Sequence, residues 1–202
     1  MISSPLKLGF LASGNGSSAR AIIAAIRSGD LAAEARLLVS NNKRAPALDL
    51  AAEKDVPALA IATQADPDTA DARLVEEMVS HGVELIVLSG YLRQLGPQTL
   101  GRYTGRILNI HPGPLPDFGG HGMYGRRVHE AVIAVGVAQS GICIHLVDEE
   151  YDRGPVIARC SVAVEPGDTA QSLEARITAL EPAFFVETLQ RIADGRLALG
   201  DA

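Results

Sequence analysis

The chain has 202 residues, of which 47% are apolar and 21% are charged, a composition that excludes disorder, collagen-like repeats and low-complexity structure. This length fits one domain or slightly more, large enough to bury a core without disulfides or a structural metal. The 18 Lys and Arg residues against 24 Asp and Glu residues give a net charge of −6, so a broad surface for nucleic-acid phosphates is not expected.

Short apolar runs alternate with longer amphipathic stretches along most of the chain. This alternation predicts βα units, in which helices lie over a parallel sheet. Strands are expected at residues 8–12, 36–40, 58–62, 85–89, 107–110, 142–147 and 156–162. Helices are expected at residues 18–27, 46–53, 69–81, 98–103, 128–135 and 169–193. The sequence therefore predicts one Rossmann-like α/β domain over residues 1–202, with a mostly parallel, twisted seven-stranded sheet and helices on both faces.

One segment breaks this pattern. Residues 111–122 contain three prolines and four glycines, which predicts a shaped loop between the fifth strand and the next helix. Loops of this length are functional or disordered more often than they are plain connectors.

The cysteines and the apolar runs bear on the environment of the protein. Cys143 and Cys160 lack CxxC spacing and a surrounding histidine cluster, so we expect free thiols and no zinc site or disulfide framework. The first residues carry no secretory signal, and no apolar run approaches the ~18 residues of a membrane span. We therefore expect a cytoplasmic protein that binds no metal and contacts neither a membrane nor nucleic acid.

A glycine-rich turn follows the first strand and leads into a helix. Close backbone approach at these glycines brings N–H groups and the positive helix end together, as an anion site requires. The spacing also fits a dinucleotide turn, but such a site places an acid about 20 positions on, where this chain has Ser40, Asn41 and Asn42. We therefore predict a site for a single phosphate, and a tight turn without a ligand is the alternative. The turn comprises Gly14, Asn15, Gly16, Ser17 and Ser18.

Asn109 and His111 stand two residues apart at the end of an apolar strand, so their side chains leave the same face of the sheet. Open α/β sheets bind ligands at the carboxyl ends of their strands. An amide beside an imidazole suits a reaction that builds negative charge on a carbonyl oxygen, with Asn109 stabilising the oxyanion and a protonated His111 donating to it. A structural hydrogen-bonding arrangement is the alternative.

Residues 148–155 supply carboxylates that would keep His111 protonated near neutrality. Asp152 is the favoured partner because Gly154 and Pro155 fix the turn behind it. A solvated acidic turn would also explain the other carboxylates of this segment. His145 lies in an alternating strand and is predicted to be a packed or hydrogen-bonded core residue.

Four motifs, in this order, resemble a known family. They are residues 13–18, residues 89–93, Asn109-Ile110-His111-Pro112 with Leu115-Pro116, and residues 148–155. The chain is similar, over nearly its whole length, to the folate-dependent phosphoribosylglycinamide formyltransferases of purine biosynthesis. The resemblance implies transfer of the formyl group of 10-formyltetrahydrofolate, a co-substrate, to the amine of N1-(5-phospho-D-ribosyl)glycinamide. The products would be the formylglycinamide ribonucleotide and tetrahydrofolate, and no metal is implied.

The resemblance also implies a role for each site residue. Asn109, His111 and Asp152 match the catalytic positions of the family. The positions that hold the ribonucleotide are matched by Gly14, Asn15, Gly16, Ser17, Ser18, Thr178 and Glu181. The folate positions are matched by Leu92, Arg93, Gln94, Leu95, Asn109, Asp148, Glu149, Glu150, Tyr151 and Asp152. The N-terminal half would thus bind the substrate phosphate, and the C-terminal half would carry the folate site and the catalytic residues.

Three other functions compete with this interpretation. Hydrolases of 10-formyltetrahydrofolate resemble the chain but carry an N-terminal regulatory domain, for which no room is expected before residue 8. Transfer-RNA formylating relatives add a C-terminal β-barrel, and the negative net charge of this chain disfavours a nucleic-acid partner. A non-catalytic nucleotide-binding module would keep the phosphate turn but not the chemistry. We expect small-molecule substrates and either a monomer or a homodimer.

Overall fold

The sheet has seven strands in the order β3-β2-β1-β4-β5-β6-β7, and the computed structural model describes residues 5–199. The strands are β1 (Leu6–Ala12), β2 (Ala33–Ser40), β3 (Ala58–Ala60), β4 (Leu85–Leu88), β5 (Ile107–His111), β6 (Gln139–Leu146) and β7 (Val156–Ala163). The first five pair in parallel, whereas β6 pairs antiparallel with both β5 and β7. The predicted fold class, a mostly parallel α/β sheet, is confirmed.

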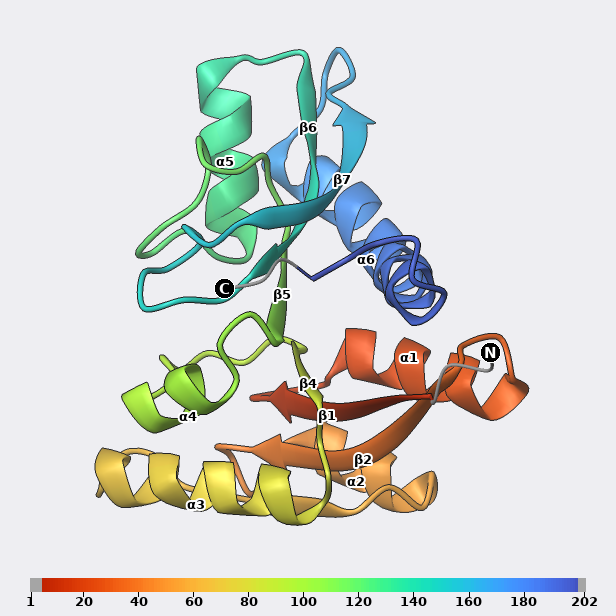
Figure 1. The fold of residues 1–202 in the computed structure, drawn as a ribbon. Helices are drawn as coiled ribbons and strands as arrows, with labels where there is room; N and C mark the ends of the chain where they lie inside the picture. The colour runs from red at the N-terminus through yellow and green to blue at the C-terminus, as the bar shows by residue number, and fades with distance from the viewer. Residues whose placement is uncertain (1–4, 200–202) are drawn as a thin grey trace.

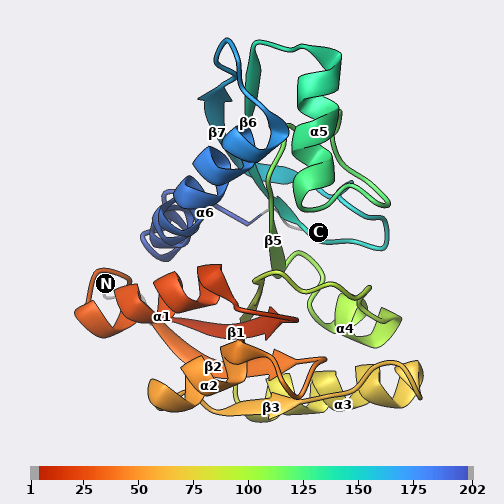
Figure 2. The same ribbon diagram turned by 180° about the vertical axis from the view of Figure 1, so that it is seen from behind.

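Helices cover both faces of the sheet (Figures 1 and 2). They are α1 (Ser17–Ser28), α2 (Pro46–Glu53), α3 (Pro67–Ser80), α4 (Pro97–Arg102), α5 (Arg126–Val135) and α6 (Ala170–Ala193). The apolar side chains of α1, α2 and α6 pack on one face, where α6 also contacts α5. Those of α3 pack on the opposite face together with Leu95 and Tyr103, which flank α4. The long α6 lies beside α1 and also contacts β6 and β7, so it connects the first half of the chain to the last two strands.

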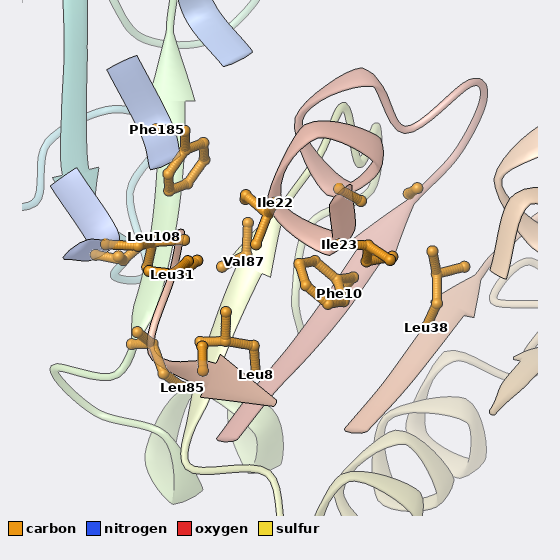
Figure 3. Packing of buried hydrophobic residues seen from close by; sticks show 14 of the residues in the cluster. Leu8, Phe10, Ile22, Ile23, Leu31, Leu38, Leu85, Val87, Leu108 and Phe185 are labelled. Atoms are coloured by element: carbon orange, nitrogen blue, oxygen red, sulfur yellow. The ribbon is translucent and has the colours of Figure 1, made fainter. Parts of the chain in front are cut away.

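Strand β1 shows how the pleat distributes these contacts. Leu8 and Phe10 point toward α1 and α6, where they meet Ile22 and Phe185 (Figure 3), whereas Leu11 points toward α3. All five side chains have no exposed surface. Burying each one stabilises the fold by about 1.5–3 kcal/mol. Because β1 is packed on both faces, its carboxyl end is fixed in the core.

Most predicted element ends shift by one to three residues, and local capping explains several of them. The helix expected from residue 69 begins at Pro67, because the Asp66 side chain accepts a hydrogen bond from the Thr69 N–H and Pro suits the first helical position. The last helix is capped by Thr169 and Ser172 and continues through Pro182 to Ala193. The expected strand at 58–62 is shorter and ends at Ala60.

Candidate active site

The glycine turn after β1 is packed against the start of α2. Gly16 adopts a left-handed conformation with φ of 62°, and a Cβ there would lie 3.0 Å from the Cβ of Ala47. The Ala47 N–H donates to the Gly14 carbonyl at 3.1 Å. Glycine is therefore required at position 16 for both conformation and space. Ser17 is exposed at the first turn of α1, and Ser18 is buried, so the turn presents an open helix N-terminus of the kind that binds anions.

Asn109 and His111 lie on the face of β5 that α6 does not cover. Their strand neighbours Leu108 and Ile110 pack into the core on the α6 side, so the alternation directs Asn109 and His111 the other way. In the antiparallel pairing, Asn109 stands opposite His145. The Asn109 Nδ2 atom lies 3.1 Å from His145 Nε2, which extends the predicted pair across the sheet to a third polar side chain.

Asp152 closes this cluster from the loop between β6 and β7. Its two carboxylate oxygens lie 3.5 Å from His111 Nδ1 and 3.4 Å from His145 Nε2, and one of them accepts the Gly120 N–H at 3.0 Å. Asp152 has a φ of 57°, a strained backbone for a non-glycine residue. Gly154 permits this turn, because a Cβ there would collide with the Leu146 carbonyl oxygen. The structure thus brings Asn109, His111 and Asp152 together as predicted.

The carbonyl contacts assign one ring proton on each imidazole. His145 Nδ1 lies 2.8 Å from the Leu146 carbonyl and must donate to it, while His145 Nε2 faces both the Asn109 amide group and an Asp152 carboxylate oxygen. His111 Nε2 lies 2.7 Å from the Phe118 carbonyl and must also donate. The Nδ1 atom of a neutral His111 therefore carries a lone pair, and protonation there would create an N–H that faces Asp152.

Two opposing effects act on the protonation predicted for His111. Burial lowers the pKa of His111 below its usual value, and the attraction of Asp152 only partly offsets this effect. Burial would raise the pKa of Asp152, but the hydrogen bond with His145 and the charge of His111 lower it below its usual value. Burial therefore disfavours the protonated form of His111, whereas its neighbours favour the ionised form of Asp152.

For His145, the sequence predicts only a packed or hydrogen-bonded core residue. It is 2% exposed, as a core histidine would be, yet its Nε2 atom lies between Asn109 and Asp152. The two-residue spacing of Cys143 and His145 repeats that of Asn109 and His111. This spacing places His145 in the same site as Asn109 only because β6 runs antiparallel to β5. The Phe118 carbonyl and the Gly120 N–H are further contacts that no side-chain pattern could indicate.

The segments matched to the folate site meet on the same side of the sheet. The Gln94 side chain donates to the Glu149 carbonyl at 3.2 Å, while Leu92 is 67% exposed and Leu95 is buried. A hollow of about 980 Å³ lies beside the acidic turn and is lined by residues of α4 and by Asp148, Glu149 and Glu150. Arg93 is exposed. Tyr151 contacts the ring of His121 edge-on, with centroids 5.9 Å apart, so the long loop lies against this turn.

The two residues predicted on the last helix lie apart from this cluster. Thr178 is exposed and Glu181 is partly buried on α6, and burial raises the pKa of Glu181 to about 7. In the described part of the chain, no hydrogen bond or ion pair joins them to the glycine turn. Helix α6 nevertheless packs along α1, the helix that this turn begins.

Within residues 5–199, no group of three or more His, Cys, Asp or Glu side chains is arranged to hold a metal ion. Of the helices described, none is long and apolar enough to cross a bilayer.

The fold is that of the formyl transferases, and the model of the formyl transferase family matches residues 6–189. The phosphoribosylglycinamide formyltransferase of Bacillus subtilis (strain 168) is 34% identical over 188 residues, which are 92% of this chain and 94% of that protein. The crystal structure of glycinamide ribonucleotide transformylase 1 from Symbiobacterium toebii superposes with a TM-score of 0.87 at 32% identity, covering 96% of this chain and 91% of that one. The chain therefore belongs to the formyl transferase family, and within it to the phosphoribosylglycinamide formyltransferases.

One plant relative is longer than this chain. The chloroplastic phosphoribosylglycinamide formyltransferase of Arabidopsis thaliana is 35% identical over 195 residues, which are 95% of this chain. The match spans 66% of that relative's length.

Proposed function

We propose that the protein transfers the formyl group of 10-formyltetrahydrofolate to the amine of N1-(5-phospho-D-ribosyl)glycinamide, a step of purine biosynthesis. The observation that carries this proposal is the cluster of Asn109, His111, His145 and Asp152 at the carboxyl end of β5. It combines amide and imidazole donors with an ionised carboxylate, as transfer between two small molecules through an oxyanion requires. The names of the relatives support the choice of substrates.

The formyl group passes directly between the two substrates, without a covalent enzyme intermediate. The amine nitrogen of the ribonucleotide bonds to the formyl carbon, and the carbonyl oxygen becomes an oxyanion. Collapse of this intermediate breaks the bond to N10 of the folate. One proton leaves the amine nitrogen and one is taken up by N10. Rate enhancement in such a transfer comes mainly from positioning the two substrates and from donors preorganised toward the oxyanion.

The residues of the cluster divide this chemistry between them. Asn109 has a second amide N–H, besides the one that faces His145, to offer the oxyanion. His111 contributes its Nε2 proton when that N–H turns from the Phe118 carbonyl toward the substrate, since catalytic hydrogen bonds often form only in the substrate complex. The ionised Asp152 accepts the amine proton, directly or through a water molecule. His145 is a positioning residue, because it holds both Asn109 and Asp152.

The two halves of the chain would bind different substrates. The ribonucleotide phosphate would lie on the turn of Gly14, Asn15, Gly16, Ser17 and Ser18, with Thr178 and Glu181 contacting the rest of the molecule. The folate would lie along Leu92, Arg93, Gln94 and Leu95 and against Asp148, Glu149, Glu150 and Tyr151. We also propose a cytoplasmic enzyme with small-molecule substrates, acting as a monomer or a homodimer and without a metal.

The test is an assay of tetrahydrofolate release from 10-formyltetrahydrofolate, followed spectroscopically with and without the ribonucleotide. Turnover only with the ribonucleotide is expected. Equal turnover without it would identify a hydrolase that uses water as the acceptor. No turnover in either case, together with retained binding of the ribonucleotide, would identify a binding module and refute the proposal.

A further inference from the structure

Ser13 lies between the glycine turn and the segment that carries Leu92. Its hydroxyl donates to the Asn41 side-chain oxygen at 2.6 Å and accepts the Leu92 N–H at 2.7 Å. Its own N–H donates to the Gly90 carbonyl at 3.1 Å. The hydroxyl of Ser13 therefore uses both its proton and a lone pair to join the ends of three strands.

A second hydroxyl, which follows β4 rather than β1, joins the same two segments. Ser89, directly after β4, accepts the N–H of Ala19 in the first turn of α1 at 3.0 Å, and this contact is buried. Strands β1 and β4 are neighbours in the sheet and pair in parallel up to Leu11 and Leu88. Their extensions, residues 13–19 and 89–92, thus run side by side and are joined by three hydrogen bonds.

This connection links two sites that are matched to different substrates. Residues 14–18 form the proposed phosphate turn, and residues 92–95 begin the proposed folate segment. Ser13 lies outside both matched segments, and its hydrogen bonds join it to Asn41, Gly90 and Leu92. A ligand that orders one segment therefore also restrains the other, so the second ligand loses less conformational entropy on binding.

We propose that Ser13 is a positioning residue that makes the binding of the two substrates cooperative. This inference rests on the proposed function, because that function assigns a ligand to each segment. Coupling between two sites is reciprocal: the ribonucleotide raises the affinity for folate by the same factor by which folate raises the affinity for the ribonucleotide.

The experiment measures this factor by titration calorimetry on the full chain. Tetrahydrofolate is titrated with and without saturating N1-(5-phospho-D-ribosyl)glycinamide, and the pair cannot react because tetrahydrofolate carries no formyl group. The expected coupling factor of the wild type is about 5-fold or more, the lower end of typical coupling between sites. Ser13→Ala brings this factor close to 1, and Ser13→Thr, which keeps the hydroxyl, retains most of it.

Ser80→Ala is the matched control. The Ser80 hydroxyl is exposed and donates to the Glu77 carbonyl at the end of α3. This helix ends just before β4 begins, whereas the loops in question follow the carboxyl ends of β1 and β4. This variant keeps the wild-type coupling factor. If Ser13→Ala does not fold, as judged by circular dichroism and thermal unfolding, Ser89→Ala removes the bond to Ala19 and tests the same connection from its other side.

Two results would overturn the inference: a wild-type coupling factor of 1, or a wild-type factor retained in folded Ser13→Ala or, in its place, folded Ser89→Ala. A wild type that binds neither ligand would instead refute the proposed function, and this inference with it.

Discussion

The glycine turn after β1 and the polar cluster on β5 and β6 are assembled in different ways. The turn is a local structure, because Gly14 to Ser18 are consecutive and one neighbour, Ala47, sets the space available. The cluster is a long-range structure, because Asn109, His145 and Asp152 come from β5, β6 and the following loop. A substitution in the turn should therefore act mainly on the binding of one substrate, and a substitution in the cluster mainly on the chemical step.

Asp152→Asn is expected to have the largest effect. The change removes the ionised carboxylate that faces both imidazoles while it keeps the shape of the side chain. We expect kcat to fall by about 10²–10⁴, the usual contribution of a positioned acid or base, with a small change in KM. The control is Asp117→Asn in the exposed part of the neighbouring loop. Steady-state kinetics at neutral pH that show less than a tenfold loss for Asp152→Asn would contradict its role as proton acceptor.

His145→Ala tests whether the cluster extends across the sheet. Without the ring, Asn109 and Asp152 each lose the partner at their 3.1 Å and 3.4 Å contacts, so both reorient. We expect a loss of about 10–100-fold in kcat, smaller than for Asp152→Asn because His145 acts only through its neighbours. His145→Gln, which can still bond Asn109, should recover part of the loss. If kcat of folded His145→Ala equals that of the wild type, the residue is a core histidine only.

Gly16→Ala perturbs the other region. Alanine in the left-handed conformation costs about 1–2 kcal/mol, and its Cβ would lie 3.0 Å from that of Ala47. We expect a lower unfolding temperature and a KM for the ribonucleotide raised about tenfold, with kcat changed less. Gly29→Ala is a close control, because Gly29 ends the same helix with φ of 82° and has no atom within 4 Å of its would-be Cβ.

Gly29→Ala should share the strain without the effect on KM. Equal KM values for the two variants would show that the glycine turn does not bind the phosphate of the ribonucleotide.

The same contrast explains what the sequence could predict. The alternation of apolar and amphipathic segments, the N-terminal position of Pro46 in α2 and the glycine turn are local signals, and all three match the structure. Strand periodicity alone predicts that Asn109 and His111 lie together. The partnership of His145 depends on antiparallel pairing, which no local signal encodes. The lowered pKa of His111 depends on its burial to 3% exposure, which is produced by loops that close over it from outside the strand.

The smallest expected effect concerns Glu181 and depends on pH. Burial raises the pKa of this carboxyl to about 7, so the folded protein binds more protons there than the unfolded chain does between the ordinary glutamate pKa and about pH 7. Stability contributed by the protonated form is therefore lost as pH rises through this interval. Glu181→Gln should remove that loss, so its unfolding temperature relative to the wild type should increase by a few degrees from pH 4 to pH 8.

If an ionised Glu181 also contacts the ribonucleotide, the wild-type affinity should weaken below about pH 7, and that step should be absent in Glu181→Gln. Calorimetry across this range distinguishes the cases: a pH step in both proteins would assign the titration to another group, such as the substrate amine.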